Sequence, residues 1–131
     1  MKFIYCDGGC HNNQEAAKRM AYGSFLVTSD EYPNHSKSMI LCKRFEFGSV
    51  TNNVAEYRIL QEALQYCINE FIAQPIIFTD SALVANQISG AYKTKEETLK
   101  PLRDSVAKDM ALIGAELRQV SRDILVGVLG H

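Results

Sequence analysis

The sequence predicts an α/β fold: a mixed five-stranded sheet of three antiparallel strands and then parallel strands, with helices on both faces. Two observations support this prediction. In the first half of the chain, strand-like segments follow one another through short polar connections. In the second half, helical and strand-like segments alternate, which requires parallel pairing. The 131 residues contain no internal repeat and no linker, so we expect a single domain over residues 1–131.

The first half is expected to form an antiparallel meander. Strand-like patterns cover residues 2–7, 21–28 and 39–47. Gly8-Gly9 is expected to end the first strand in a turn, with a polar loop over residues 11–19. Asp30, Pro33 and Asn34 predict a turn within residues 29–37.

The second half begins with helical periodicity over residues 51–71, which Thr51 or Asn52 can cap. Pro75 bars continuation of this helix, and residues 76–79 form a short apolar strand of the buried, parallel kind. The remaining elements are expected to be helices at 81–88 and 94–113, the latter interrupted or restarted at Pro101, a strand at 115–120 and a helix at 122–129.

The composition excludes several classes of protein. Hydrophobic residues make up 47% and charged residues 22%, which is typical of soluble globular proteins. No apolar run approaches the roughly 20 residues that span a bilayer, and the start lacks a signal peptide, so we expect a cytoplasmic protein without a membrane partner. The four cysteines form neither a zinc pattern nor a disulfide framework and are expected to be free thiols packed as small hydrophobes.

Three isolated acids stand in apolar surroundings. Asp7 and Asp80 each follow a strand-like run, and Glu56 lies on the apolar stripe of the helix at 51–71. Each acid also has a structural explanation. Asp7 could belong to a turn, Glu56 could favour the helix N-terminus, and Asp80 could be a helix N-cap.

Convergence of the three acids favours a metal site. The carboxyl ends of strands at one edge of an α/β sheet are a common place for ligands, and the helix that carries Glu56 crosses the sheet to reach the Asp80 strand. Three neighbouring carboxylates repel one another unless a cation lies between them. Ligand sets made only of oxygen select hard ions such as Mg²⁺ or Mn²⁺.

Several sequence blocks resemble successive motifs of type 1 ribonuclease H, most closely its compact bacterial and archaeal forms. They are Asp-Gly-Gly at 7–9, Thr-Asn-Asn-Val-Ala-Glu-Tyr at 51–57 and Thr-Asp-Ser-Ala-Leu-Val at 79–84, continued by Asn-Gln-Ile-Ser-Gly-Ala-Tyr-Lys at 86–93. The Thr-Asn-Asn-x-x-Glu-Tyr block is the most specific of these. The resemblance covers nearly the whole chain in the right order and implies a ribonuclease H-like fold.

The resemblance implies endonucleolytic hydrolysis of the RNA strand of an RNA–DNA hybrid by two Mg²⁺ or Mn²⁺ ions. Asp7, Glu56 and Asp80 would be the catalytic metal ligands, with Asp7 bridging the ions. The residues that would contact the hybrid backbone are uncharged donors, which suit phosphates and the RNA 2′-hydroxyl: Asn13, Thr51, Asn52 and Asn53. The same residues can serve as loop and cap residues. No obligatory protein partner is indicated.

The chain departs from the family pattern at its end. The family usually supplies a fourth acid near the start of the last helix, and counting from Arg122 places that position at Leu129, which cannot bind a metal. His131 is the favoured replacement, as ligand or proton carrier, and Asp123 is a second candidate. The alternatives are that Asp123 only favours the helix dipole, that His131 is a frayed terminus, or that nothing replaces the acid.

Three competing interpretations remain open at the level of sequence. The first is a nucleic-acid-binding module of this fold that is weakened or inactive as a catalyst. The second is a nuclease of the same fold that acts on DNA. The third is an unrelated α/β protein whose three acids are caps. The net charge of −1 gives no dominant basic surface, so tight non-specific binding to nucleic acid is not expected. The net charge says nothing about a local groove.

Overall fold

The computed structural model describes residues 1–33 and 38–130. Its centre is a five-stranded sheet in the order β3-β2-β1-β4-β5. The strands are β1 (Phe3–His11), β2 (Met20–Thr28), β3 (Met39–Gly48), β4 (Ile76–Thr79) and β5 (Glu116–Gln119). β1, β2 and β3 pair antiparallel, whereas β1, β4 and β5 pair parallel, which confirms the predicted mixed sheet.

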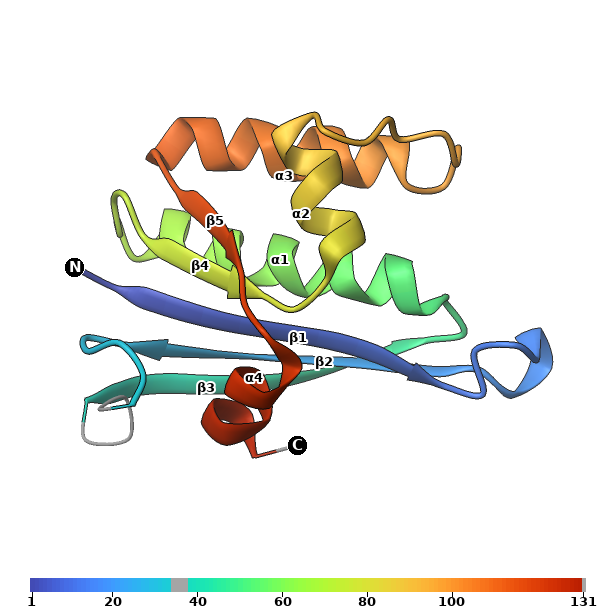
Figure 1. The fold of residues 1–131 in the computed structure, drawn as a ribbon, viewed down its shortest axis with the longest axis horizontal. Coiled ribbons are helices and arrows are strands. Elements are labelled where there is room, and N and C mark those ends of the chain that lie inside the picture. Colours follow the sequence, from blue (N-terminus) through green and yellow to red (C-terminus); the bar gives the residue numbers. More distant parts are fainter. Residues whose placement is uncertain (34–37, 131) are drawn as a thin grey trace.

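Helices cover both faces of this sheet, as predicted. The helices α1 (Asn52–Asn69), α2 (Ala82–Ser89) and α3 (Lys100–Ile113) lie on one face, and α4 (Arg122–Leu129) lies on the other (Figure 1). A short 3₁₀ helix, η1 (Ala16–Lys18), interrupts the connection between β1 and β2. Within the described ranges, no helix combines the length and apolar character that crossing a membrane requires.

The larger core lies between the sheet and α1. Alternate residues of β1 and β2 point to this face, because successive side chains of a strand point in opposite directions: Ile4, Cys6, Phe25 and Val27. The wide buried face of α1 packs against them through Ala55, Tyr57, Ile59, Leu60, Ala63, Leu64 and Cys67. Val106 and Met110 of α3 close this core from outside. α1 is therefore held rigidly across the sheet.

The opposite face carries a smaller core under α4. Tyr5, Leu26 and Phe78 of the sheet contact Leu125, Val128 and Leu129 of the helix. The rings of Tyr5 and Phe78 stack with centroids 4.7 Å apart. α4 has only eight residues, so it covers only a part of this face.

The prediction that β1 ends in a turn at Gly8-Gly9 is wrong. β1 continues to His11, and Gly8 and Gly9 pair with Gly23 and Tyr22 of β2. Both glycines are absent from the positive-φ positions of the described chain, so their role is to make room. A Cβ on Gly8 would lie 2.7 Å from the Ala55 carbonyl carbon, so this glycine lets α1 approach the strand backbone closely.

Two helix boundaries also differ from the prediction. α1 ends at Asn69, before Phe71, whose φ of 56° lies in the left-handed region. α3 begins at Lys100, with Pro101 in its first turn, where a missing N–H costs no hydrogen bond. The four cysteines are free thiols, as expected. Cys6 and Cys67 are packed in the core, whereas Cys42 is exposed, so the expected packing is wrong for Cys42.

Candidate active site

The candidate site lies where β1 and β4 separate. Their parallel pairing runs from Phe3 and Ile76 to Tyr5 and Phe78. Asp7 and Asp80 each stand two residues beyond the last pair of that register. The two aspartates therefore occupy equivalent levels on neighbouring strands, at the edge predicted from the sequence.

Asp7 lies in the middle of β1. It pairs with Ser24 of β2 and is 4% exposed. The turn interpretation of Asp7 is therefore wrong, since the backbone is extended on both sides of it. A carboxylate buried in the centre of a sheet is costly unless other groups compensate its charge, which marks Asp7 as a functional candidate.

Glu56 approaches from α1. Thr51 is the N-cap of this helix, and its hydroxyl accepts a hydrogen bond from the Val54 N–H at 3.3 Å. Glu56 follows one turn later and is partly buried. Because Gly8 lets the helix backbone come within van der Waals distance of β1, Glu56 lies beside the Asp7 segment.

The electrostatics of Glu56 include the charges of both aspartates. The pKa of Glu56 is raised from 4.5 to about 7, chiefly by burial. The hydrogen bond from Ser81 and the charge of Arg122 lower this pKa, whereas the charges of Asp80 and Asp7 contribute to raising it. Mutual repulsion of carboxylates is the effect expected when acids gather without a cation between them.

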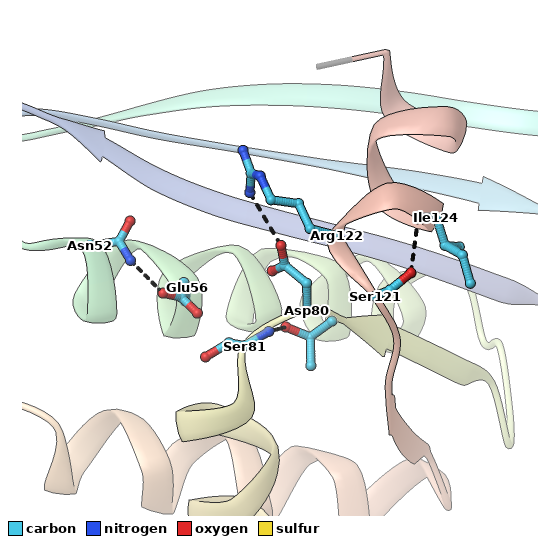
Figure 2. Close-up of polar contacts among 8 residues, drawn as sticks. Asn52, Glu56, Asp80, Ser81, Ser121, Arg122 and Ile124 are labelled. Atoms are coloured by element: carbon cyan, nitrogen blue, oxygen red, sulfur yellow. Dashed lines mark hydrogen bonds and ion pairs between the residues drawn. The ribbon is translucent and has the colours of Figure 1, made fainter.

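Asp80 directly follows β4 and is paired with a cation from the far side of the sheet. The Arg122 guanidinium Nη1 lies 3.2 Å from Asp80 Oδ2. Figure 2 shows Arg122 reaching Asp80 from the first turn of α4. The N-cap of α2 is Ser81, whose hydroxyl accepts from the Val84 N–H at 3.1 Å, so the interpretation of Asp80 as an N-cap is wrong.

Glu56 also has a polar neighbour that holds it in place. The Asn52 side-chain amide donates to Glu56 Oε1 at 2.6 Å, one turn back on α1 (Figure 2). In this arrangement of side chains, residues 1–33 and 38–130 contain no group of three His, Cys, Asp or Glu placed to hold a metal ion. The donor set of three carboxylates suits Mg²⁺ or Mn²⁺, but Arg122 and Asn52 occupy two of the donors.

The predicted hybrid-binding residues gather at the start of α1. Asn13, in the loop after β1, accepts a hydrogen bond on Oδ1 from the Asn52 N–H at 2.9 Å. Asn52 and Asn53 line an open pocket of about 380 Å³ together with Glu56 and Asp80. Thr51 uses its hydroxyl as the helix cap. The loop and cap roles are therefore present for Thr51 and Asn13, and Asn52 and Asn53 face the acids.

The position of the missing fourth acid is apolar in the structure as well. Leu129 is buried in the smaller core, 7% exposed, beneath the sheet. Asp123 is exposed in the first turn of α4, where its charge favours the helix N-terminus. His131 lies outside the described residues.

Sequence reasoning missed three residues of the site. Arg122 pairs with Asp80, Ser81 donates to Glu56 and caps α2, and Tyr22 lines the pocket beside the acids. Ser81 could have been found from its place immediately after Asp80. Arg122 could not, because its approach depends on how α4 packs beneath the sheet.

Comparison with known proteins agrees with this fold. A family model described as RNase H matches residues 1–124. The N-terminal RNase H domain of Rv2228c from Mycobacterium tuberculosis is 27% identical, with a TM-score of 0.79, covering 93% of this chain and 83% of that one. LC11-RNase H1, solved in complex with an RNA/DNA hybrid, is 27% identical, with a TM-score of 0.78 and coverages of 94% and 87%.

A third structure shares the fold at lower identity. RNase H1 from the halophilic archaeon Halobacterium salinarum NRC-1 is 22% identical, with a TM-score of 0.81, covering 95% of this chain and 88% of that one.

Curated relatives are longer than this chain. The bifunctional protein Rv2228c of Mycobacterium tuberculosis and the uncharacterized protein Mb2253c of Mycobacterium bovis are each 35% identical over 99 residues, which is 76% of this chain and 25% of theirs. The chain thus spans about a quarter of the length of these relatives. With the family model matched from the first residue to the start of α4, the chain belongs to the RNase H family.

Proposed function

We propose that this protein is a metal-dependent endonuclease that hydrolyses the RNA strand of RNA–DNA hybrids. The observation that carries the proposal is the meeting of Asp7, Glu56 and Asp80 at the edge where β1 and β4 separate, with the electrostatic coupling of Glu56 to both aspartates. Membership of the RNase H family and the likeness to LC11-RNase H1, which was solved with an RNA/DNA hybrid, support the choice of substrate.

The three carboxylates would hold the catalytic ions. When bound, Mg²⁺ or Mn²⁺ ions supply an activated water and stabilise the charge on the leaving 3′-oxygen. Glu56, with its pKa raised to about 7, must lose its proton, and Asp80 must turn from Arg122. Asp7 is fixed by β1 on both sides and would hold an ion from this strand position.

The polar residues at the start of α1 would position the hybrid. Asn53 and Asn52 line the pocket of the acids, and Asn13 and Thr51 fix the adjoining loop and helix end. Neutral amides and hydroxyls donate to phosphates and to the 2′-hydroxyl, which distinguishes RNA from DNA. Arg122, released from Asp80, would have a phosphate of the substrate as its alternative partner.

The decisive experiment is cleavage of a labelled RNA–DNA hybrid in Mg²⁺ or Mn²⁺, with wild type, Asp80→Asn and the control Asp104→Asn. Asp104 is an exposed acid of α3 paired with Arg103. We expect wild type and Asp104→Asn to cleave, and Asp80→Asn to lose more than the roughly 10- to 100-fold that changes to outer partners of metal ligands cost. Equal activity of the two variants would contradict the proposal. DNA duplex tested in parallel identifies a DNA nuclease of the same fold.

A second candidate function is a nucleic-acid-binding module without activity. The observation that favours it is the apolar Leu129 at the fourth-acid position together with the Arg122–Asp80 ion pair. Binding of hybrid with no product in either metal would establish this candidate. His131 and Asp123 remain the proposed replacements for the fourth acid, and loss of activity in His131→Ala but not in Asp123→Asn would assign the role to the histidine.

A further inference from the structure

A groove continues from the candidate site along the face of the sheet that α4 leaves uncovered. Two open pockets, of about 400 and 340 Å³, adjoin there and share His11, Tyr22 and Glu46. The pairings Asp7–Ser24–Arg44 and Gly9–Tyr22–Glu46 place these side chains on the same face as Tyr5 and Leu26, which α4 covers. We call the surface lined by the two pockets the sheet-face groove.

The groove opens directly into the site of the acids. Tyr22 and Arg122 line both the larger pocket of the groove and the pocket that contains Glu56 and Asp80. The Tyr22 ring lies over Gly9, since a Cβ at Gly9 would fall 2.5 Å from the Tyr22 hydroxyl oxygen. A polymer chain that leaves the acids in this direction therefore passes over Tyr22.

The charges of the groove are suited to an anionic polymer. Its lining includes three arginines, Arg19, Arg44 and Arg122, and one carboxylate, Glu46. Arg122 is paired with Asp80 of the adjoining pocket, so Arg19 and Arg44 supply the positive charge that Asp80 does not compensate. The whole chain carries a net charge of −1, so this surface is locally more basic than the protein. Arg44 is exposed and forms no ion pair with any residue of the described ranges, so its guanidinium is available to a phosphate.

The aromatic groups are suited to unpaired bases. The rings of His11 and Tyr22 lie with centroids 5.0 Å apart and 32° between their planes, at the centre of the groove. Aromatic rings interleaved with arginines bind single-stranded nucleic acid, because each unpaired base exposes a face that can stack. A duplex keeps those faces stacked on its own neighbouring bases and cannot use such a ring.

We propose that the sheet-face groove binds a single-stranded extension of the nucleic-acid substrate, with an unpaired base on Tyr22 and phosphates on Arg44 and Arg19. The inference rests on the proposed function in taking the cleaved hybrid as the source of that strand. The preferred substrate is then a hybrid that continues as single-stranded RNA beyond its duplex part.

The test measures binding in EDTA, where cleavage is prevented. Fluorescence anisotropy compares a labelled blunt hybrid with the same hybrid carrying a single-stranded RNA extension of about six nucleotides, placed at either end of the RNA. We expect an extension at one end to tighten binding roughly tenfold, since stacking contributes about 1–3 kcal/mol per base. The gain should shrink with added salt.

The variants are Arg44→Ala and Tyr22→Leu, with Lys43→Ala as the matched control. Lys43 neighbours Arg44 on β3 but points to the opposite face, where its ammonium lies 5.9 Å from the centroid of the Tyr66 ring. We expect both groove variants to lose the gain from the extension, Arg44→Ala to keep its affinity for blunt hybrid, and Lys43→Ala to keep the gain. If Tyr22→Leu does not fold, as judged by circular dichroism, Arg44→Ala alone decides.

The outcomes separate this inference from the proposed function. The proposed binding role of the groove is overturned if neither extension tightens binding. It is also overturned if Lys43→Ala and Arg44→Ala lose the gain in affinity equally. A gain that Arg44→Ala abolishes, in a protein that cleaves no hybrid in Mg²⁺ or Mn²⁺, supports the groove and overturns the nuclease. Cleavage of the hybrid, with no gain in affinity from either extension, supports the nuclease and overturns the binding role of the groove.

Discussion

The two faces of the sheet differ in how completely they are covered. On one face, α1, α2 and α3 form a continuous core that includes the fully buried Leu64 and Tyr57 (Figure 1). On the other face, the eight residues of α4 cover Tyr5, Leu26 and Phe78 and leave the surface around Tyr22 and Arg44 open. The covered face fixes Glu56, and the open face leaves room for a substrate beside Asp80. The candidate site therefore lies between the face that α1, α2 and α3 cover and the face that α4 covers only in part.

The largest expected effect comes from the same substitution, leucine to alanine, in the core on each face. Leu64→Ala removes a fully buried side chain from the large core, and Leu125→Ala removes one that is 1% exposed from the small core. We expect Leu64→Ala to lower the free energy of unfolding by about 4 kcal/mol and Leu125→Ala by about 2–3 kcal/mol, because the thinner layer can relax into the cavity. Urea unfolding measures both. Equal losses would show that α4 packs as rigidly as α1.

Successive glycines of β1 provide a finer test. A Cβ at Gly8 would meet the Ala55 backbone at 2.7 Å, whereas a Cβ at Gly9 would meet the Tyr22 side chain, which can move into the open groove. We expect Gly8→Ala to destabilise the fold by about 2–3 kcal/mol and Gly9→Ala by less than about 1 kcal/mol. Thermal unfolding of the two variants decides, and a costlier Gly9→Ala would mean that Tyr22 is held firmly in place.

The pH dependence of stability tests the protonation of Glu56 in the candidate site. The pKa of Glu56 is raised from 4.5 to about 7 in the folded state, so the folded protein holds a proton that the unfolded chain releases between these values. This contribution to stability is fully present below pH 4.5 and is lost as pH rises through 7. Glu56→Gln removes this titrating group and its effect on the pH dependence of stability. In EDTA, the free energy of unfolding of the variant relative to wild type should therefore increase by about 1–2 kcal/mol from pH 5 to pH 8.

The control for this pH prediction is Glu97→Gln. Glu97 is an exposed acid paired with Lys100, and its replacement should change stability by less than about 0.5 kcal/mol at either pH. Urea midpoints at the two pH values measure the difference. A constant difference in stability between wild type and Glu56→Gln at the two pH values would contradict the raised pKa of Glu56, of which burial is the largest cause.

The smallest expected effect concerns the ion pair that links the two faces. The Arg122 side chain is 64% exposed, so Arg122→Ala should change the free energy of unfolding by less than about 1 kcal/mol, as should Arg118→Ala, which breaks an exposed pair with Glu116. Only Arg122→Ala frees Asp80 Oδ2. We therefore expect Mn²⁺ to raise the Tm of Arg122→Ala more than that of Arg118→Ala. Equal shifts would show that Asp80 does not bind the ion.

The sequence predicted the sheet, its mixed pairing and the helices on both faces, because periodicity and turn residues are local properties. It was wrong at Gly8-Gly9, where two glycines suggested a turn but serve the approach of α1 and Tyr22 to an uninterrupted strand. Such contacts are between segments far apart in the sequence, so a local pattern cannot reveal them.

Only the part of the candidate site that follows from local sequence patterns could be predicted. The edge that brings Asp7 and Asp80 to one level follows from strand order, which the pattern of elements predicts. The pairing of Asp80 with Arg122 depends on the packing of α4 beneath the sheet, and the binding roles of Asn13, Thr51, Asn52 and Asn53 stay predictions.

The short pairing between β1 and β4 keeps room between the two aspartates of the candidate site. The ladder stops at Tyr5 and Phe78, and one acid follows two residues later on each side. Substitutions that extended the ladder by two residues would make Asp7 and Asp80 direct neighbours and would increase the repulsion between their carboxylates. The separation of Asp7 from Asp80 thus depends on a β1–β4 ladder that ends two residues before each of them.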